Sequence, residues 1–249
     1  MSVFGPVYSK YYDLLYKDKN YQEEYNYIKN LIMERGYNGK SVLDIGCGTG
    51  KHLKYFKDDG YDVAGVDLSE NMILEAKKHL NQENDLICSK ASDFKFNKKF
   101  DLIISLFHVM SYQTSNEEIE KVFFNVKEHL IKDGLFIFDF WYGPGVLTDP
   151  PIVKIKRLED EKFLVTRLTE PVMRYNENIV DINYEIIVED KLTHFTEKIY
   201  EKHEMRYLFL SEIKLISKYL GLSFANSFEW LKFNELSENA WYGLAIFKI

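Results

Sequence analysis

Residues 1–141 alternate between short apolar runs and stretches in which apolar positions recur with the period of a helix. The stretch Glu70–Leu80 has one apolar stripe and follows Ser69, which predicts a helix with Ser69 as its N-cap. Ser115–Glu118 has the pattern of a capping box and predicts a helix that runs to about Ile131. Five apolar runs have the length of buried strands, namely Ser41–Ile45, Val63–Val66, Leu86–Cys88, Phe100–Phe107 and Leu135–Trp141. Strands and helices that alternate at this spacing predict a parallel sheet with helices on both faces.

The pattern changes beyond residue 144. From Val180 to Val188 apolar and polar residues alternate, which is typical of an antiparallel strand that is buried on one face. Segments 152–158, 163–175 and 195–207 are its expected partners. We therefore interpret residues 145–207 as a small antiparallel β insert that serves as a lid or a dimer surface.

The C-terminal residues return to the first pattern. Ser211–Leu220 has helical periodicity, and Leu222–Phe228 and Trp241–Ile249 have the composition of two more strands. Residues 1–144 and 208–249 are therefore expected to form one α/β core. Its sheet should be mixed and seven-stranded, with helices on both faces.

The composition limits the partners of this fold. Acidic side chains outnumber basic ones by 39 to 32, the net charge is −7, and the longest basic runs are pairs, so nucleic acid is a poor candidate. No apolar stretch approaches the roughly 20 residues of a membrane span. The N-terminus lacks an apolar signal core, and Cys47 and Cys88 do not make a disulfide scaffold. We expect a cytoplasmic protein, a monomer or homodimer, that contacts neither nucleic acid nor a membrane.

A glycine-rich turn, Gly46–Gly50, joins the first predicted strand to a helix, and such turns let a ligand approach the backbone closely. The dinucleotide pattern G-x-G-x-x-G is incomplete, because Lys51 stands where its third glycine should be. Asp44, before the turn, suits an ammonium group better than a pyrophosphate. Asp67, at the end of the second strand, can bind both hydroxyls of a ribose. Together these residues indicate a ligand with a ribose, a cation and no phosphate.

The segment Val42–Gly50, Val-Leu-Asp-Ile-Gly-Cys-Gly-Thr-Gly, resembles the motif of the class I S-adenosylmethionine-dependent methyltransferases. The resemblance implies a Rossmann-like sheet and S-adenosylmethionine as the cofactor, with S-adenosylhomocysteine as its product. The residues expected to bind this cofactor are Tyr12, Tyr21, Asp44, Gly46, Cys47, Gly48, Thr49, Gly50, Asp67, Leu68, Met72, Ser92, Asp93, Phe94, Ser105 and Leu106.

Within this set, the resemblance gives particular roles to residues that follow the second, third and fourth strands. Ser92–Phe94 would surround the adenine, with the Asp side chain reaching its exocyclic amine, and Leu68 and Met72 would pack on the ring. Ser105 and Leu106 would place backbone groups near the methionine moiety. Simple core packing is an equal alternative for the apolar residues.

The resemblance extends over nearly the whole chain to the sugar N-methyltransferases, which methylate the amino group of nucleotide-linked amino-deoxyhexoses. It depends on Tyr12–Tyr16 followed by Tyr21, on the glycine-rich turn, and on the insert after the fifth strand. It implies that Tyr16 lies beside the transferred methyl group, that Tyr21 binds the cofactor carboxylate, and that Tyr112 faces the acceptor. Those enzymes carry an arginine on the last strand, where this chain has Ala240–Gly243.

Methyl transfer from a sulfonium needs little acid–base assistance. Holding the nucleophile about 3 Å from the methyl group, with water excluded, supplies much of the rate. An amine acceptor must lose a proton, and His108 or a water can take it. The catalytic candidates are therefore Tyr16, His108 and Tyr112. The chain is 16% aromatic, and Trp141 and Tyr142 are further candidates for an aromatic wall that stabilises the sulfonium charge.

Several of these candidates have structural alternatives. His108 at the end of an apolar strand is also typical of a buried wall histidine. His203 and Arg206 either resemble a recurring strand of related methyltransferases or form a salt-bridged edge. Arg174 and Arg167 either meet a diphosphate or belong to a solvated strand face. The candidates for acceptor binding are thus Trp141, Tyr142, Arg174, His203 and Arg206. The six His and two Cys have no metal-ligand spacing, so no metal is expected.

The expected function is methyl transfer from S-adenosylmethionine to a small molecule. The preferred acceptor is the amino group of a nucleotide-activated amino-deoxy sugar, such as a dTDP-linked amino sugar. O- or C-methylation of another metabolite stays open, because catalysis by positioning leaves no diagnostic residue. A cofactor-binding module without turnover and an NAD-dependent oxidoreductase are the alternatives from other classes.

Overall fold

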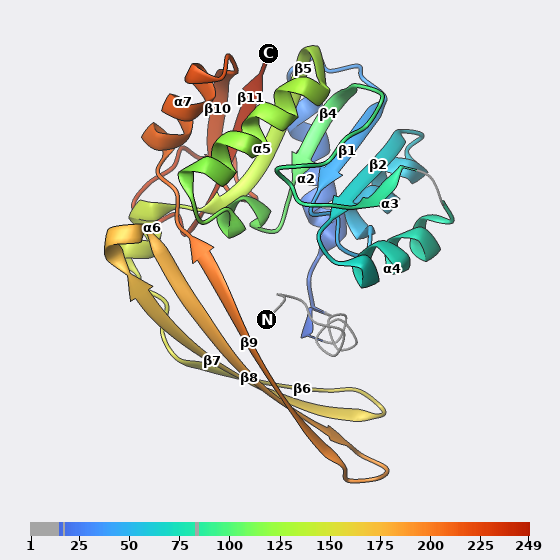
Figure 1. Ribbon diagram of the computed structural model, residues 1–249, viewed down its shortest axis with the longest axis vertical. Helices are drawn as coiled ribbons and strands as arrows, with labels where there is room; N and C mark the ends of the chain where they lie inside the picture. Colours follow the sequence, from blue (N-terminus) through green and yellow to red (C-terminus); the bar gives the residue numbers. More distant parts are fainter. Residues whose placement is uncertain (1–14, 17, 83–84) are drawn as a thin grey trace. The chain divides into compact units, whose positions relative to one another are not determined.

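The computed structural model describes residues 15–16, 18–82 and 85–249, and these residues form two compact units (Figure 1). The larger unit consists of Asn20–Asp149 and Tyr207–Ile249. The smaller unit consists of Pro150–Arg206 together with the described residues before Asn20. The sequence pattern placed those N-terminal residues in the core instead. The role of the insert as an acceptor lid or a dimer surface stays a prediction.

A seven-stranded mixed sheet lies at the centre of the larger unit, which confirms the predicted α/β fold (Figure 1). Its spatial order is β10-β11-β5-β4-β1-β2-β3, and β1 to β5 run parallel while β11 is antiparallel to both of its neighbours. The strands are β1 Ser41–Ile45, β2 Asp62–Asp67, β3 Leu86–Cys88, β4 Phe100–Ser105, β5 Leu130–Trp141, β10 Ser223–Glu229 and β11 Tyr242–Lys248. The strand order reverses between β1 and β4, so a ligand is expected at the carboxyl ends of these two strands.

Helices cover both faces of this sheet. The first face carries α2 (Tyr21–Met33), α3 (Lys51–Asp58) and α4 (Glu70–Leu80), and the second carries α5 (Asn116–His129) and α7 (Leu210–Tyr219). The shorter helices are η1 (Val109–Tyr112) and α6 (Gly143–Thr148).

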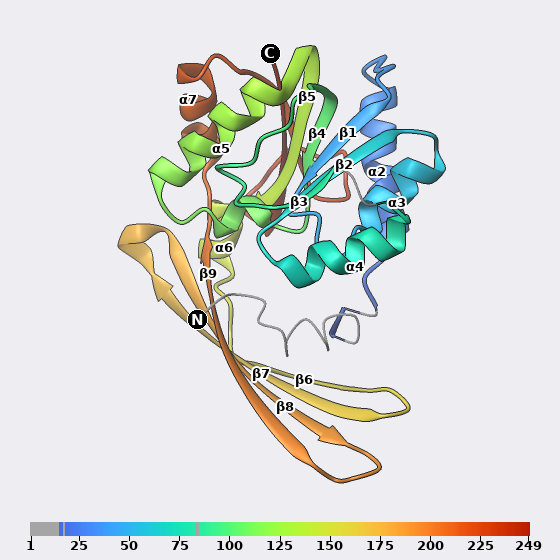
Figure 2. The same cartoon turned by 45° about the vertical axis from the view of Figure 1, so that its right-hand side comes forward.

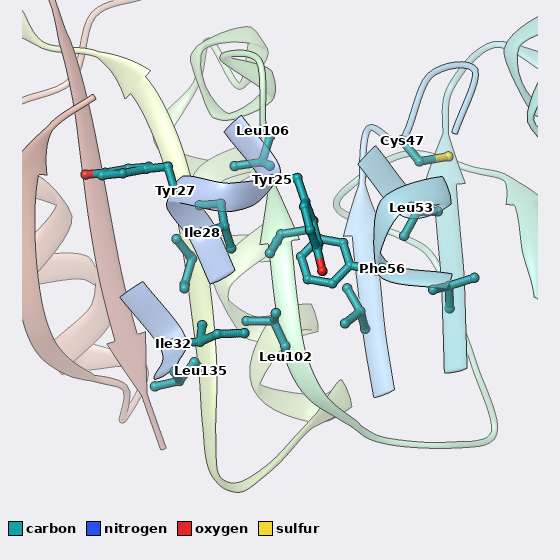
Figure 3. Close-up of a cluster of buried hydrophobic side chains, with 14 of the residues drawn as sticks. Tyr25, Tyr27, Ile28, Ile32, Cys47, Leu53, Phe56, Leu102, Leu106 and Leu135 are labelled. Carbon is teal, nitrogen blue, oxygen red and sulfur yellow. The ribbon is translucent and has the colours of Figure 1, made fainter. Parts of the chain in front are cut away.

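Apolar side chains pack each layer of helices against the sheet. On the first face, Ile28 and Ile32 of α2 and Phe56 of α3 pack with Leu102 and Leu135 of the strands (Figure 3). The second face is more aromatic, because Phe rings of α5, β5 and β11 meet there at centroid distances of 4.9–5.8 Å. Much of the high aromatic content is therefore used in the core.

The smaller unit is a four-stranded antiparallel sheet in the order β6-β7-β8-β9 (Figure 2). The strands are β6 Lys154–Glu159, β7 Phe163–Arg174, β8 Ile179–Asp190 and β9 Thr196–Arg206. Along β8, Val180, Ile182, Ile186 and Val188 are buried, whereas the alternate residues are partly exposed. The period of two in the sequence therefore predicted this strand and its buried face.

Some predicted boundaries and contacts differ from the structure. Ser69 stands at the N-cap of α4 as predicted, but its side chain makes no capping bond, so that part of the prediction is wrong. Its backbone N–H instead donates to Oδ1 of Asp67, at 2.8 Å. The helix expected to reach Ile131 ends at His129, because Leu130 already pairs with β4 and begins β5.

The capping box at Ser115 is confirmed, and it gives a test of local stability. The Ser115 Oγ accepts from the Glu118 N–H at 3.1 Å, and the Glu118 side chain accepts from the Ser115 N–H. We expect Ser115→Ala to lower the free energy of unfolding by about 1 kcal/mol, because the first turn of α5 loses an acceptor. Ser69→Ala is the matched control, and urea denaturation measures both variants. Equal losses in the two variants would contradict the assignment.

Candidate cofactor and acceptor site

The glycine-rich turn between β1 and α3 leaves its middle glycine beside open space. Gly46 and Gly48 have left-handed backbones, with φ of 79° and 53°. A Cβ at Gly46 would collide with Val109, whereas a Cβ at Gly48 would have no described atom within 4 Å. The N–H of Gly46 donates to the carbonyl of Val66 at 2.7 Å, which ties the turn to β2. A ligand can therefore approach the backbone at Gly48 without displacing described protein atoms.

Asp67, at the end of β2, is held by backbone N–H groups. Its Oδ2 accepts from Gly48 at 2.9 Å and its Oδ1 accepts from Ser69 at 2.8 Å. Burial raises the pKa of Asp67, although these backbone hydrogen bonds act in the opposite direction. Each carboxylate oxygen has a second acceptor position, so Asp67 can also accept from two ribose hydroxyls.

Asp44, in β1, is a buried carboxylate without a partner. Its side chain is 1% exposed, and neither oxygen has a hydrogen-bond partner among the residues that the structure describes. Burial is the main cause that raises the pKa of Asp44 well above its usual range, and the charges of Asp67 and Asp139 add to it. Such a group is stabilised by a cation, so this position fits the ammonium group of the predicted cofactor.

A third acid lies at the end of β5, and the sequence analysis did not single it out. Asp139 is fully buried, and its Oδ1 accepts from the backbone N–H of His108 at 3.0 Å. Its Oδ2 lies 2.7 Å from Nδ1 of the His108 ring, at ion-pair distance but without the angle of a hydrogen bond. The ring of His108 stacks on Tyr242 of β11, with centroids 4.5 Å apart and planes at 11°. The signal in the sequence was a single acid within the otherwise apolar run Leu135–Trp141.

The segment predicted to surround the adenine is divided between core and surface. Phe94 is 1% exposed and its ring packs on Phe96 and His129, which favours the alternative of core packing. Asp93 is exposed and Ser92 is half-buried. The contacts that these residues make with a cofactor stay a prediction.

The two residues predicted to pack on the adenine ring differ in exposure. Leu68 is 64% exposed, so its side chain is accessible to a ring, whereas Met72 is 4% exposed and belongs to the buried face of α4.

Four further cofactor candidates are buried beside the turn. Ser105 donates its hydroxyl to the carbonyl of Ile45 at 3.0 Å, so its side chain joins the ends of β4 and β1. Leu106 and Cys47 are 2% and 5% exposed and belong to the apolar core. The carbonyl of Thr49 lies 2.8 Å from Nδ1 of a histidine in α4. Through their backbones these residues can still contact a ligand.

Tyr21 begins α2 and lies near the start of α3. Its ring meets the edge of the His52 ring at a centroid distance of 5.0 Å, and Nζ of Lys51 lies 5.1 Å from its centroid. His52 Nε2 lies 2.6 Å from Oε2 of Glu24, and both side chains are buried. This pair, which the sequence analysis missed, joins α2 to the helix that follows the glycine-rich turn.

Three aromatic candidates for the acceptor side lie at the ends of η1 and β5. Tyr112 and Tyr142 are half-buried. The ring of Trp141 meets that of Trp241 at 4.8 Å, and its buried Nε1–H has no acceptor among the described residues. Trp241 lies in Ala240–Gly243, the stretch that corresponds to the arginine of the sugar N-methyltransferases. At this position the chain therefore places an aromatic ring against Trp141.

The remaining candidates belong to the smaller unit. The Arg167 guanidinium lies 5.9 Å from the ring centroid of Tyr16 and 5.1 Å from that of Tyr184. His203 is 3% exposed, its ring meets that of Tyr184, and its Nε2 lies 3.0 Å from Oε2 of Glu201. Tyr12 lies outside the described residues.

Two arginines of this unit differ in their surroundings. Arg174 is held by three carboxylates, those of Glu177, Asp181 and Glu204, which supports a structural role on a strand face. Arg206 is 6% exposed. A role of either residue in acceptor binding stays a prediction.

The described part of the chain contains no cluster of three or more His, Cys, Asp or Glu side chains that is arranged to hold a metal ion. It also contains no helix that combines the length and the apolar character needed to cross a membrane.

The state of Asp44 predicts how stability depends on pH. The raised pKa means that the folded chain holds the Asp44 proton more tightly than the unfolded chain. Stability from this proton is therefore present below the ordinary pKa of 3.8 and is lost as the pH rises toward the raised value. Replacing Asp44 by Asn should remove this loss. Relative to wild type, the variant should gain about 1–3 kcal/mol in free energy of unfolding between about pH 4 and pH 8.

Denaturant unfolding of the ligand-free protein at the two pH values measures this difference. Asp133→Asn, at an exposed position, is the control and should show no such trend. A stability difference between Asp44→Asn and wild type that does not change with pH would show that Asp44 is not a buried unpaired acid.

Comparison with known proteins finds a family and several relatives to which this chain is similar. Residues 42–134 match the family described as Methyltransferase domain. Over 189 residues the chain is 29% identical to dTDP-3-amino-3,4,6-trideoxy-alpha-D-glucopyranose N,N-dimethyltransferase of Streptomyces venezuelae, and the match covers 75% of this chain and 79% of that protein.

Solved structures share the fold over nearly the whole chain. The crystal structure of Streptomyces venezuelae DesVI has a TM-score of 0.82 at 24% identity and covers 100% of this chain and 99% of its own. SAM-bound CalS10, an amino pentose methyltransferase from Micromonospora echinaspora, has a TM-score of 0.77 at 18% identity, with coverage of 100% and 98%. Residues 42–134 thus match a methyltransferase domain, and the chain as a whole resembles the S-adenosylmethionine-dependent sugar N-methyltransferases.

Proposed function

We propose that this chain is a methyltransferase that transfers methyl groups from S-adenosylmethionine to the amino group of a nucleotide-activated amino-deoxy sugar. The observation that carries the proposal is the buried, unpartnered carboxylate of Asp44 next to a glycine-rich turn and a second acid, Asp67. The named relative that acts on a dTDP-linked amino sugar supports the choice of acceptor.

The family match supports S-adenosylmethionine as the cofactor. When bound, this cofactor supplies a methyl group activated by the positive charge of its sulfonium. Asp44 would pair with its ammonium group, and Asp67 would accept from its ribose hydroxyls. The backbone at Gly48 would allow close approach. These three assignments agree with the burial, free acceptor positions and open space found at each residue.

The acceptor side needs a positioned amine more than a strong catalyst. The buried Nε1–H of Trp141 can donate to an oxygen of the acceptor, and the rings of Trp141 and Tyr142 can exclude water from one side of it. Tyr112 ends η1 in the same unit. We assign Tyr16 to the acceptor on the resemblance to the sugar N-methyltransferases.

Asp67 provides a test of cofactor binding. We expect Asp67→Ala to weaken binding of S-adenosylhomocysteine by about 1.5–3 kcal/mol, because the ribose hydroxyls lose a charged acceptor. Isothermal titration calorimetry measures this affinity, with Asp133→Asn as an exposed control. Unchanged affinity in Asp67→Ala would contradict the placement of the ribose, and binding of NAD by wild type would favour an oxidoreductase.

The acceptor is tested with purified protein, S-adenosylmethionine and a panel of dTDP-linked 3-amino and 4-amino sugars. We expect mass spectrometry to detect a mass gain of one or two methyl groups on at least one amino sugar. The matched 3-hydroxy and 4-hydroxy sugars, which lack the amine, should gain none. Methylation of the hydroxy sugars alone would indicate an O-methyltransferase. Cofactor binding without turnover on any acceptor would indicate a binding module.

A further inference from the structure

We propose that Asp139 and His108 act as a dyad in which the buried carboxylate fixes the imidazole with its proton on Nδ1, so that Nε2 takes a proton from the amine of the acceptor. This inference rests on the proposed function, because only a protonated nucleophile needs such a step. His108 would be the catalytic residue, and Asp139 would be a positioning residue that acts through it.

The carboxylate binds the backbone of the histidine and lies beside its ring. Oδ1 of Asp139 accepts from the His108 N–H at 3.0 Å, and Oδ2 lies 2.7 Å from the ring Nδ1. The parallel register that pairs Ser105 with Phe138 brings the ends of β4 and β5 together and makes this double contact possible. Because a carboxylate is acceptor-only when ionised, it favours the tautomer with the proton on Nδ1.

The orientation of the ring is fixed on a second side. Tyr242 of β11 stacks on it at 4.5 Å with nearly parallel planes, so the imidazole cannot rotate freely. The backbone of His108 is left-handed, with φ of 64°, which is uncommon for a residue other than glycine and turns the chain sharply after β4. Nδ1 is buried although the side chain is 14% exposed, so the exposed part of the side chain does not include the nitrogen that lies beside Asp139.

The dyad lies next to the glycine-rich turn. Val109, the residue after His108, fills the space beside Gly46, and the charge of Asp139 contributes to the raised pKa of Asp44. The histidine therefore follows β4 at the edge of the sheet where the order of strands reverses, which is where ligands bind in such sheets. A ring there can meet a nucleophile that approaches the cofactor.

The groups around the imidazole suit proton uptake. The ionisable residues of the packed elements toward this end of the sheet are Asp139 of β5, Tyr242 of β11, Tyr112 of η1 and Asp44 of β1, whereas Lys132 and Asp133 of β5 and Lys248 of β11 lie toward the opposite end. None of these four carries a positive charge, and the carboxylate of Asp139 stabilises the imidazolium that proton uptake creates.

The proton step balances without a further reactant. An N–H bond of the acceptor ammonium breaks, its electron pair stays on nitrogen as the lone pair that attacks the methyl group, and an Nε2–H bond forms on His108. The imidazolium later gives the proton to water. The dyad thus raises the fraction of acceptor amine that is free to react.

The first experiment measures the tautomer of His108 by ¹⁵N NMR of the ligand-free protein, with its signal assigned by loss in His108→Asn. We expect the Nδ1–H tautomer in wild type, the same tautomer in Asp139→Glu where that variant folds, and a shift toward Nε2–H in Asp139→Asn. His194→Asn, at an exposed turn position, controls for removal of a histidine. The Nε2–H tautomer in wild type would overturn the inference.

The second experiment follows kcat and KM against pH with the dTDP-amino sugar that wild type methylates. We expect His108→Asn and Asp139→Asn to lower kcat at neutral pH by about 10²-fold. Affinity for S-adenosylhomocysteine should not change in His108→Asn, and the acid limb of the kcat profile should be lost in that variant. An unchanged acid limb in His108→Asn would refute the role as proton acceptor.

The two experiments separate this inference from the proposed function. If wild type methylates no amino sugar, the proposed function fails, and the NMR measurement still decides whether Asp139 fixes the tautomer of His108. If wild type methylates an amino sugar and the tautomer is wrong, only the dyad fails.

Discussion

The larger unit buries one carboxyl group, that of Asp44, away from water and without a partner among the described residues. The free-energy cost of this burial is the main physical constraint on the unit. Asp44 is buried in β1, and the charges of Asp67 and Asp139 add to the unfavourable surroundings of its carboxylate. A cation that binds there relieves part of this cost, whereas the ligand-free protein bears it in full. Asp44 therefore lowers the stability of the ligand-free fold at the position proposed to bind the cation, and such a loss of stability is common at functional sites.

The three acids are distinguished by what holds them. Asp67 is held by two backbone N–H groups and Asp139 by a histidine, whereas Asp44 has no partner among the described residues. This difference agrees with the tasks proposed for them, since a group with unsatisfied charge favours a cation and a group with fixed geometry orients its neighbour. Helices on both faces of the sheet fill the core with rings and aliphatic side chains, and this packing holds the strands that carry the three acids in place.

Much of the fold and part of the site could be predicted from the sequence because the signals were local. The strand periods, the capping box at Ser115 and the acids at Asp44 and Asp67 each depend on a few neighbouring residues. Asp139 could not be recognised in the same way, because its partner His108 is brought to it only by the register between β4 and β5. The pair of Glu24 with a histidine of α3 was missed for the same reason. The capping bond predicted for the Ser69 side chain is absent, because a sequence shows which residues suit a cap but not whether the side-chain oxygen faces the N–H groups of the first turn.

The contact between Val109 and Gly46 has a consequence for the order in which ligands bind. Val109 belongs to the same short segment as His108 and Tyr112, and it occupies the space that a side chain at Gly46 would need. On the proposed function, His108 and Tyr112 meet the acceptor, so a displacement of the turn by the cofactor would be transmitted to them by steric contact. The affinities for cofactor and acceptor would then be thermodynamically linked, and each ligand would change the affinity for the other by the same factor.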